Sequence, residues 1–215
     1  MIYFDPQQLP STLEIQISHV WGHNKPLEQP LASCLFTWTP KGLHIQFQAR
    51  FFDMPAPPAP AGTFWKLWEW EVVEFFIVGD EEHYLEIECS PHGHYLILKL
   101  HHIRNIKEKM MMIDYQSSLH KTSTFNYAPL IESTSHPHMS STPYWYADLL
   151  LPFDLLPPPQ LKPHGWDYQV NAFMYHIYKD QPYHALAYDL GEGAPDFHRI
   201  HAYPSWHMLA KSNEI

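Results

Sequence analysis

The sequence predicts an all-β protein, an antiparallel β-sandwich with jelly-roll-like connections. Short runs of branched and aromatic residues recur, several in strict alternation with polar ones, which is typical of strands that bury one side. Turn residues separate these runs at short spacing, as in sandwiches. The 215 residues also include 21 prolines and show almost no helical periodicity, which disfavours long helices.

The N-terminal part predicts one strand and then a hairpin. Residues 13–17 alternate apolar and polar side chains. Residues 35–38 and 43–49 flank a Pro-Lys-Gly turn at 40–42, so we expect these two strands to pair. The proline-rich stretch over 52–62 is expected to form a surface loop with polyproline II character.

The middle of the chain predicts a three-stranded meander. Its strands are expected at 72–78, 84–89 and 94–100, separated by Gly-Asp-Glu-Glu and Ser-Pro-His-Gly turns. Residues 101–142 are mostly polar, and we expect a weaker strand and irregular loops there.

The C-terminal part predicts further strands at 144–151, 166–178 and 184–188. One short helical turn is expected over 152–156, because prolines follow it directly. A compact segment is expected near 206–209.

These elements add up to about nine or ten strands in one domain that spans residues 1–215. Long loops are expected at 52–66, 101–142 and 189–205.

Composition and charge narrow the classes of partner. The formal net charge is −10, so the chain lacks the basic footprint that a nucleic acid or an anionic membrane surface requires. No apolar run approaches the roughly 20 residues of a membrane span. Cys34 and Cys89 alone make no disulfide framework. The first residues are not those of a secretory leader, so we expect a soluble, cytoplasmic protein.

The most informative stretch is residues 65–78, WKLWEWEVVEFFIV, which places three tryptophans and three glutamates at an apolar strand. Aromatic rings hold the C–H face of a sugar, and carboxylates bind its hydroxyl groups. The structural alternative is that the aromatic residues belong to the core and that Glu74 points to solvent.

Three glutamates on the predicted meander, Glu74, Glu86 and Glu88, could converge on one cleft. Such carboxylates suit glycoside hydrolysis, or a hard cation such as calcium. The structural alternative is that they lie on solvated strand faces. His-x-His pairs leave a transition-metal site open, but no Cys-x-x-Cys or helical His pair accompanies them.

Two motif regions carry a resemblance to a known family. Residues 67–100 contain Trp-Glu-Val-Val-Glu, then Tyr-Leu-Glu-Ile-Glu and Pro-His-Gly, and residues 194–198 add Ala-Pro-Asp-Phe-His. Together they resemble a small family of proteins that is known by sequence and not by activity. His198 lies in the second region, and a hydrogen bond from it to Glu74 or Asp196 is a structural alternative to a role in binding.

A more distant resemblance suggests a function. The order Trp-x-x-x-x-Val-Glu-x-Phe, then Tyr-x-Glu-x-Glu-x-x-Pro-x-Gly, is similar to family 9 carbohydrate-binding modules. That resemblance implies a β-sandwich that holds a sugar between two aromatic rings, with bound calcium nearby. It implies that Trp68 is the first of these rings, that Glu74 is a sugar-binding carboxylate, and that Phe197 stands where the second ring, a tryptophan, would be.

The same resemblance places Glu86 where a basic residue is usual, which reverses a charge in the site. It places Asn171 and Phe173 on a strand that supplies amide contacts. The predicted ligand-binding residues are therefore Trp68, Glu74, Glu86, Asn171, Phe197 and His198.

Three functions follow from these residues. The first is a binding module for a saccharide or a similar small polar ligand, with no cofactor required and calcium as the candidate ion. The second is a hydrolase-like enzyme that uses Glu74, Glu86 and His198 as acid and base. The third is an intracellular interaction protein that has lost the sugar site. We expect binding rather than catalysis, because no recognised catalytic motif occurs.

Overall fold

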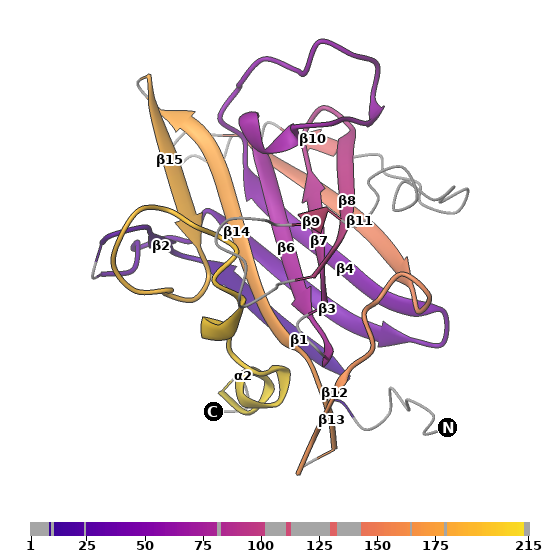
Figure 1. Ribbon diagram of the computed structural model, residues 1–215. Helices are drawn as coiled ribbons and strands as arrows, with labels where there is room; N and C mark the ends of the chain where they lie inside the picture. The colour runs from indigo at the N-terminus through magenta and orange to yellow at the C-terminus, as the bar shows by residue number, and fades with distance from the viewer. Residues whose placement is uncertain are drawn as a thin grey trace.

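Two β-sheets stacked face to face form the protein in the computed structural model, which describes residues 9, 11–23, 25–80, 83–101, 111–112, 130–132, 143–163, 165–178 and 180–212 (Figure 1). The strands pair antiparallel throughout, apart from one short parallel pair at a sheet edge. The predicted all-β antiparallel sandwich is therefore confirmed.

The first sheet has five strands. Their order is β1 (Thr12–Ile17), β3 (Ala32–Thr39), β4 (Gly42–Arg50), β11 (Tyr144–Pro152) and β10 (Leu130–Glu132). The predicted hairpin is present, since Thr39 pairs with Gly42 across a two-residue turn. Gly42 has φ 144, and a Cβ there would collide with the carbonyl oxygen of Leu151 on the neighbouring strand, so this tight approach requires glycine.

The second sheet has eight strands and carries the candidate site. Their order is β2 (His19–Val20), β15 (Gln181–Leu186), β14 (Gln169–Tyr178), β6 (Val72–Val78), β7 (His83–Cys89), β8 (His94–His101) and β5 (Gly62–Thr63), with β9 (Met111–Met112) paired to β8. The predicted meander is confirmed as β6, β7 and β8. A separate two-stranded ribbon consists of β12 (Gln160–Lys162) and β13 (Gly165–Asp167).

The predicted strand over 166–178 is divided into β13 and β14 at Tyr168. The side chain of Asp167 accepts the backbone N–H of Tyr168 at 2.9 Å, and the Tyr168 carbonyl accepts the N–H of Trp206 at 2.8 Å. These two bonds replace ladder bonds at that position and break the strand. The last predicted strand begins earlier than expected, as β15.

The compact segment predicted near 206–209 is a helix, α2 (Trp206–Ser212). The Ser205 hydroxyl accepts the N–H of Met208 at 3.4 Å, as an N-cap does. Trp206 and Leu209 are buried against the sandwich, while Met208 is 69% exposed. This three-residue spacing gives the helix one apolar face.

The polar region over 101–142 lies largely outside the described residues, and only β9, β10 and one residue of β8 are described within it. The predicted loop over 189–205 contains no strand, and it includes a short 3-10 turn, η4 (Ile200–Ala202). Within the described part of the chain, no helix is long and apolar enough to span a membrane.

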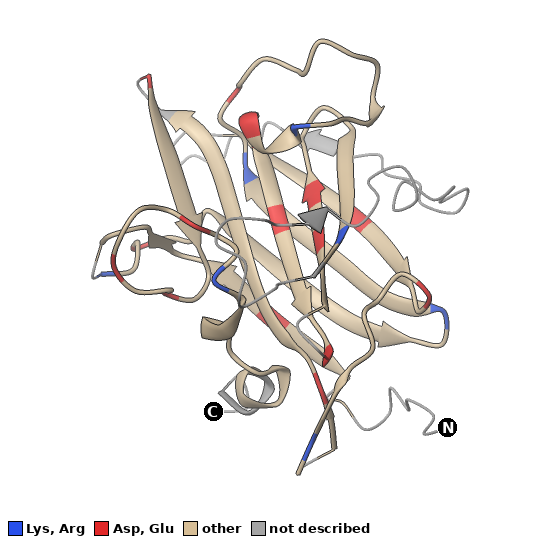
Figure 2. Ribbon diagram, viewed as in Figure 1, with Lys and Arg blue, Asp and Glu red and all other residues tan. Residues whose placement is uncertain are grey.

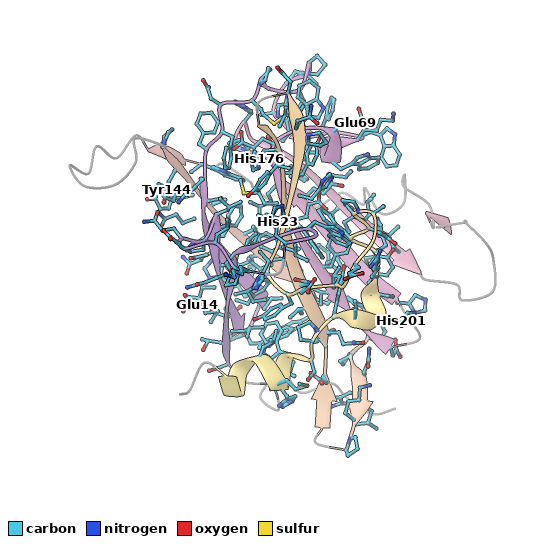
Figure 3. All side chains as sticks on the ribbon, turned by 90° about the vertical axis from the view of Figure 1, so that its left-hand side faces the viewer. Glu14, His23, Glu69, Tyr144, His176 and His201 are labelled. Carbon is cyan, nitrogen blue, oxygen red and sulfur yellow. The ribbon has the colours of Figure 1, made fainter. Side chains whose placement is uncertain are left out.

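Two hydrophobic cores lie on opposite sides of the eight-stranded sheet. The larger one fills the space between the sheets and includes Phe36, Phe75 and Trp145. The smaller one lies on the outer side and includes Phe76, Phe173 and Tyr203. In Figure 3, Glu14 and Tyr144 of the five-stranded sheet lie at one edge of the molecule, and Glu69 and His201 lie at the other. The outer side of the second sheet is therefore covered by its own layer of loops.

Candidate ligand-binding site

Strand alternation divides β6 and β7 between the two cores. Phe75 of β6 and Ile87 of β7 point between the sheets, so their neighbours point outward. Glu74 and Phe76 occupy the outward side of β6, and Glu86 shares that side of β7. Alternation along β6 and β7 therefore places carboxyl groups and aromatic rings together on the outer side of the eight-stranded sheet.

Glu74, Glu86 and Glu88 form a buried carboxyl cluster in the middle of this surface. Their exposed fractions are 2%, 4% and 0%. Glu74 pairs directly with Glu88 across β6 and β7, and Glu86 is two residues from Glu88 on the same side. Figure 2 shows these acidic positions at the centre of the two strands. The alternative of solvated strand faces is therefore wrong, because the loop over 187–205 and the turn before β6 cover this side.

Burial raises the pKa of every carboxyl in this cluster. It raises the pKa of Glu86 to about 7. Burial and the charge of Glu86 raise the pKa of Glu74 well above 4.5, and the same two causes act on Glu88. Glu86 Oε2 and both carboxyl oxygens of Glu88 are buried with no hydrogen-bond partner.

A pocket of about 510 Å³ opens over this cluster, and Glu74 and Glu86 line it. Two further carboxyl groups, those of Glu69 and Asp196, also line it. The volume lies in the range of small-molecule sites.

Aromatic rings form the walls of the pocket. Phe197 stacks on the buried Phe173, with ring centres 4.2 Å apart and an angle of 17°. His184 meets Phe197 edge-on at 5.8 Å, and its ring is tilted by 50° against that of Tyr175 at 5.2 Å. Trp68 lines the same pocket and is half-buried, as is Phe197. Neither ring belongs to the core between the sheets.

The turn that carries Trp68 is short and conformationally unusual. Lys66 has φ 64 and ψ 38, a left-handed conformation, and the 3-10 turn η2 (Leu67–Glu69) follows it. Leu67 is buried in the outer core and fixes the turn, and Trp65 packs edge-on against Trp68 at 4.9 Å. The indole of Trp68 is thereby held at the mouth of the pocket.

His198 joins the covering loop to the sheet. Its ring Nδ1 lies 3.0 Å from the hydroxyl of Tyr84 on β7, and its ring meets Phe76 edge-on at 5.4 Å. Its backbone N–H donates to the carboxylate of Asp196 at 3.0 Å. The alternative that His198 contacts Asp196 is thus realised through the backbone, whereas the ring bonds to Tyr84. Tyr203 also donates its hydroxyl to the Phe197 carbonyl.

Comparison with known proteins finds relatives of similar length. The sequence is 29% identical to the UPF0462 protein C4orf33 of Homo sapiens, over 91% of this chain and 88% of that one. It is 29% identical to the Danio rerio homologue, over 87% and 85% of the two chains, and 28% identical to the Rattus norvegicus homologue, over 87% and 84%. The chain resembles the UPF0462 proteins. No family model matches the sequence.

A solved structure shares the fold of this UPF0462-like chain. It is a proposed carbohydrate-binding protein from Bacteroides uniformis, with a TM-score of 0.61 and 15% identity over 89% of this chain and 84% of that one. A family 9 carbohydrate-binding module from Caldicellulosiruptor kristjanssonii, in complex with cellotriose, gives a TM-score of 0.41 at 10% identity over 82% and 73% of the two chains, which supports no argument about this chain.

Five of the six predicted ligand-binding residues of the UPF0462-like chain line the pocket. Asn171 is the exception. Its side-chain amide donates to the Tyr188 carbonyl at 3.1 Å and accepts the Tyr188 N–H at 3.2 Å. These two hydrogen bonds hold the start of the covering loop over 187–205 in place. Contact between Asn171 and a ligand stays a prediction.

Tyr175 and His184 are among the lining residues that were not predicted to bind a ligand. Alternation along β14 could have indicated Tyr175, which is four residues from Asn171 and so shares its side of the strand. His184 lies at the pocket because it pairs with Tyr175 across β14 and β15. The sequence of either strand alone does not determine this register.

No group of three or more His, Cys, Asp or Glu side chains in the described residues has the arrangement to hold a metal ion. Calcium at the carboxyl cluster stays a prediction.

Proposed function

We propose that this protein binds a saccharide, or a similar small polar ligand, in the pocket between Trp68 and Phe197. One observation carries the proposal: half-buried aromatic rings and buried carboxyl groups line the same pocket. A pyranose presents a C–H face that packs on rings and a rim of hydroxyls that bond to carboxyl groups. Glu74 and Glu86 are placed for the second contact, and the rings for the first.

The raised pKa values suit a neutral polar ligand as well. A protonated carboxyl group donates one hydrogen bond and accepts others, so it can pair with a hydroxyl in either direction. At neutral pH, the pKa of about 7 leaves Glu86 divided between the two forms. The fold shared with the Bacteroides uniformis protein is compatible with this function, but the pocket's chemistry is what supports it.

Tryptophan fluorescence tests the proposal. The native chain is titrated with a panel of mono- and disaccharides, with and without calcium, alongside Trp68→Ala. We expect a saturable change in the native chain and its loss in Trp68→Ala, because the variant removes one wall of the pocket. Trp166→Ala is the matched control, since Trp166 lies on the ribbon strand β13 and does not line the pocket. No saturable response to any sugar, or an equal response in Trp68→Ala, contradicts the proposal.

A hydrolase is the second candidate, favoured by the raised pKa values of Glu74 and Glu86 in one pocket. Glu74 and Glu86 would act as the acid and the base. His198 is bonded to Tyr84 and would position that ring rather than exchange the proton. Release of nitrophenol from aryl glycosides, absent in Glu86→Gln, would favour this candidate over simple binding.

A further inference from the structure

Carboxyl groups predominate among the titratable side chains of the pocket. Four of them line it, those of Glu69, Glu74, Glu86 and Asp196, and none of the described lining residues is a lysine or arginine. Two histidines also line it: burial lowers the pKa of His184, and the ring of His198 lies 3.0 Å from the Tyr84 hydroxyl. Glu69 does pair with Lys66 at 3.2 Å, but both side chains are 55% exposed at the rim. The deeper carboxyl groups of Glu74 and Glu86 are left without such a partner.

The arginine in the covering loop is turned away from the pocket. Arg199 donates to the carbonyl oxygens of Leu190, Glu192 and Ala194 at 3.2, 2.8 and 3.2 Å. Its guanidinium also lies 5.2 Å from the ring centre of Trp21. These contacts direct its guanidinium to the backbone of its own loop, and Arg199 is not among the residues that line the pocket.

The carboxyl group of Glu86 gives a second, independent indication that the pocket binds a hydrogen-bond donor. It is 4% exposed and lines the pocket, and its Oε2 atom is buried without a hydrogen-bond partner. A buried acceptor with no donor is destabilising, and more so when it is charged. A bound ligand that brings a donor to this atom would remove this destabilisation.

The pocket walls also favour a positive charge. The aromatic residues Trp68, Tyr175 and Phe197 line the pocket, and an aromatic face attracts a cation. A hydroxyl group would satisfy Glu86 through one hydrogen bond, but it would leave the ionised form of Glu86 without a counter-charge. An ammonium group offers three donors and the charge together.

We propose that the ligand carries a protonated amine that binds at Glu86, and that the class it belongs to is a saccharide with a free amino group. This rests on the saccharide binding proposed above and makes it specific. The amine donates to Glu86 and lies near Glu74, while the sugar ring packs on Trp68 and Phe197.

Isothermal titration calorimetry of the native chain tests this with three matched probes: glucosamine, glucose and N-acetylglucosamine, each also as its disaccharide. We expect the amine to bind at least about tenfold more tightly than either neutral sugar, as one charge-assisted hydrogen bond implies. Equal affinity for all three overturns the amine inference and leaves saccharide binding in place. Binding of none overturns both, and binding of choline but no saccharide also overturns both.

Glu86→Gln locates the preference. The amide keeps the size of the side chain and removes its charge, so the ratio of the affinities for glucosamine and glucose should fall to within about threefold, whatever the change in the affinity for glucose itself. Glu28→Gln is the control, since it makes the same change at an exposed residue that does not line the pocket. A preference that survives in Glu86→Gln, or that is lost equally in Glu28→Gln, overturns the inference. Because the comparison among sugars is made first on the native chain, it does not depend on the variant's folding.

Discussion

Glu86 shows at the scale of one residue how burial changes a side chain's chemistry. Its neighbours are Glu74 on β6, Glu88 on its own strand, and the rings of Tyr84 and Tyr203. None of these supplies a positive charge, and burial therefore raises the pKa of Glu86 from 4.5 to about 7.

This pKa predicts how stability depends on pH. Between pH 4.5 and 7 the folded state holds a proton on Glu86 that the unfolded state has released, so the free energy of unfolding falls as pH rises. The slope from one such group is up to about 1.4 kcal/mol per pH unit. Glu86→Gln removes the pH dependence that Glu86 gives to the free energy of unfolding. It also removes the charge that raises the pKa of Glu74 and Glu88.

We therefore expect the stability of Glu86→Gln, relative to the native chain, to increase from pH 5 to pH 7. Urea unfolding of both chains at several pH values measures it. His176 has its pKa lowered to about 4 by burial, so it acts in the opposite direction over pH 4 to 6.5, but it does so in both chains and cancels in the difference. Parallel curves for the two chains would show that Glu86 is not a buried, protonated group.

Alternation in the sequence was enough to place Glu74, Glu86 and Glu88 on one side of the meander. Alternation does not reveal which side of the sheet the loops cover. That depends on Phe197 and Tyr203, which lie more than 90 residues away and close over the carboxyl groups only in the folded chain. The burial, and hence the chemistry, follows from long-range packing.

At the scale of elements, Glu71 connects the proline-rich loop to the start of β6. Its carboxylate accepts the backbone N–H of Phe52 at 2.9 Å and that of Met54 at 3.3 Å. His92 contributes from the turn before β8, with its ring Nε2 2.8 Å from the Met54 carbonyl. The buried side chain of Glu71 thus provides hydrogen-bond acceptors for two backbone N–H groups at the start of the proline-rich loop.

We expect Glu71→Ala to destabilise the protein by about 2 kcal/mol or more, because it leaves two backbone N–H groups without an acceptor. Glu71→Gln should cost less, since one oxygen remains. Hydrogen exchange at residues 52 and 54 should accelerate in Glu71→Ala. The control is Glu69→Ala, whose exposed pair with Lys66 is worth at most about 1 kcal/mol. Equal losses in Glu69→Ala and Glu71→Ala would contradict this role.

Elements defined by local pattern were predicted well, and those defined by distant contacts were not. The hairpin of β3 and β4 and the meander of β6 to β8 need only alternation and turn residues. The strand breaks at Tyr168, and the helix begins after Ser205, because hydrogen bonds join these two positions. The Asp167 carboxylate accepts from Tyr168 and Ser205, and the Tyr168 carbonyl accepts the N–H of Trp206. The sequence pattern of neither segment alone reveals this contact between them.

At the scale of the whole molecule, α2 closes one end of the space between the sheets. Trp206 is fully buried, and its ring packs against Phe36 at 5.8 Å and Trp38 at 5.4 Å, both on β3. Phe36 in turn meets Phe75 of β6 edge-on at 5.6 Å. The helix is therefore joined to both sheets through one aromatic cluster.

Because Trp206 joins these layers, we expect Trp206→Ala to cost about 3–5 kcal/mol, the range for removing a large buried aromatic side chain. The loss should lower the stability of both sheets together, so fluorescence and far-ultraviolet circular dichroism should give coincident unfolding transitions at a lower urea concentration. Met208→Ala is the control on the same helix, since Met208 is 69% exposed and should change stability by less than about 0.5 kcal/mol. If instead only α2 unfolds early while the sheets keep their native stability, the helix is an appendage of the sandwich and not part of its core.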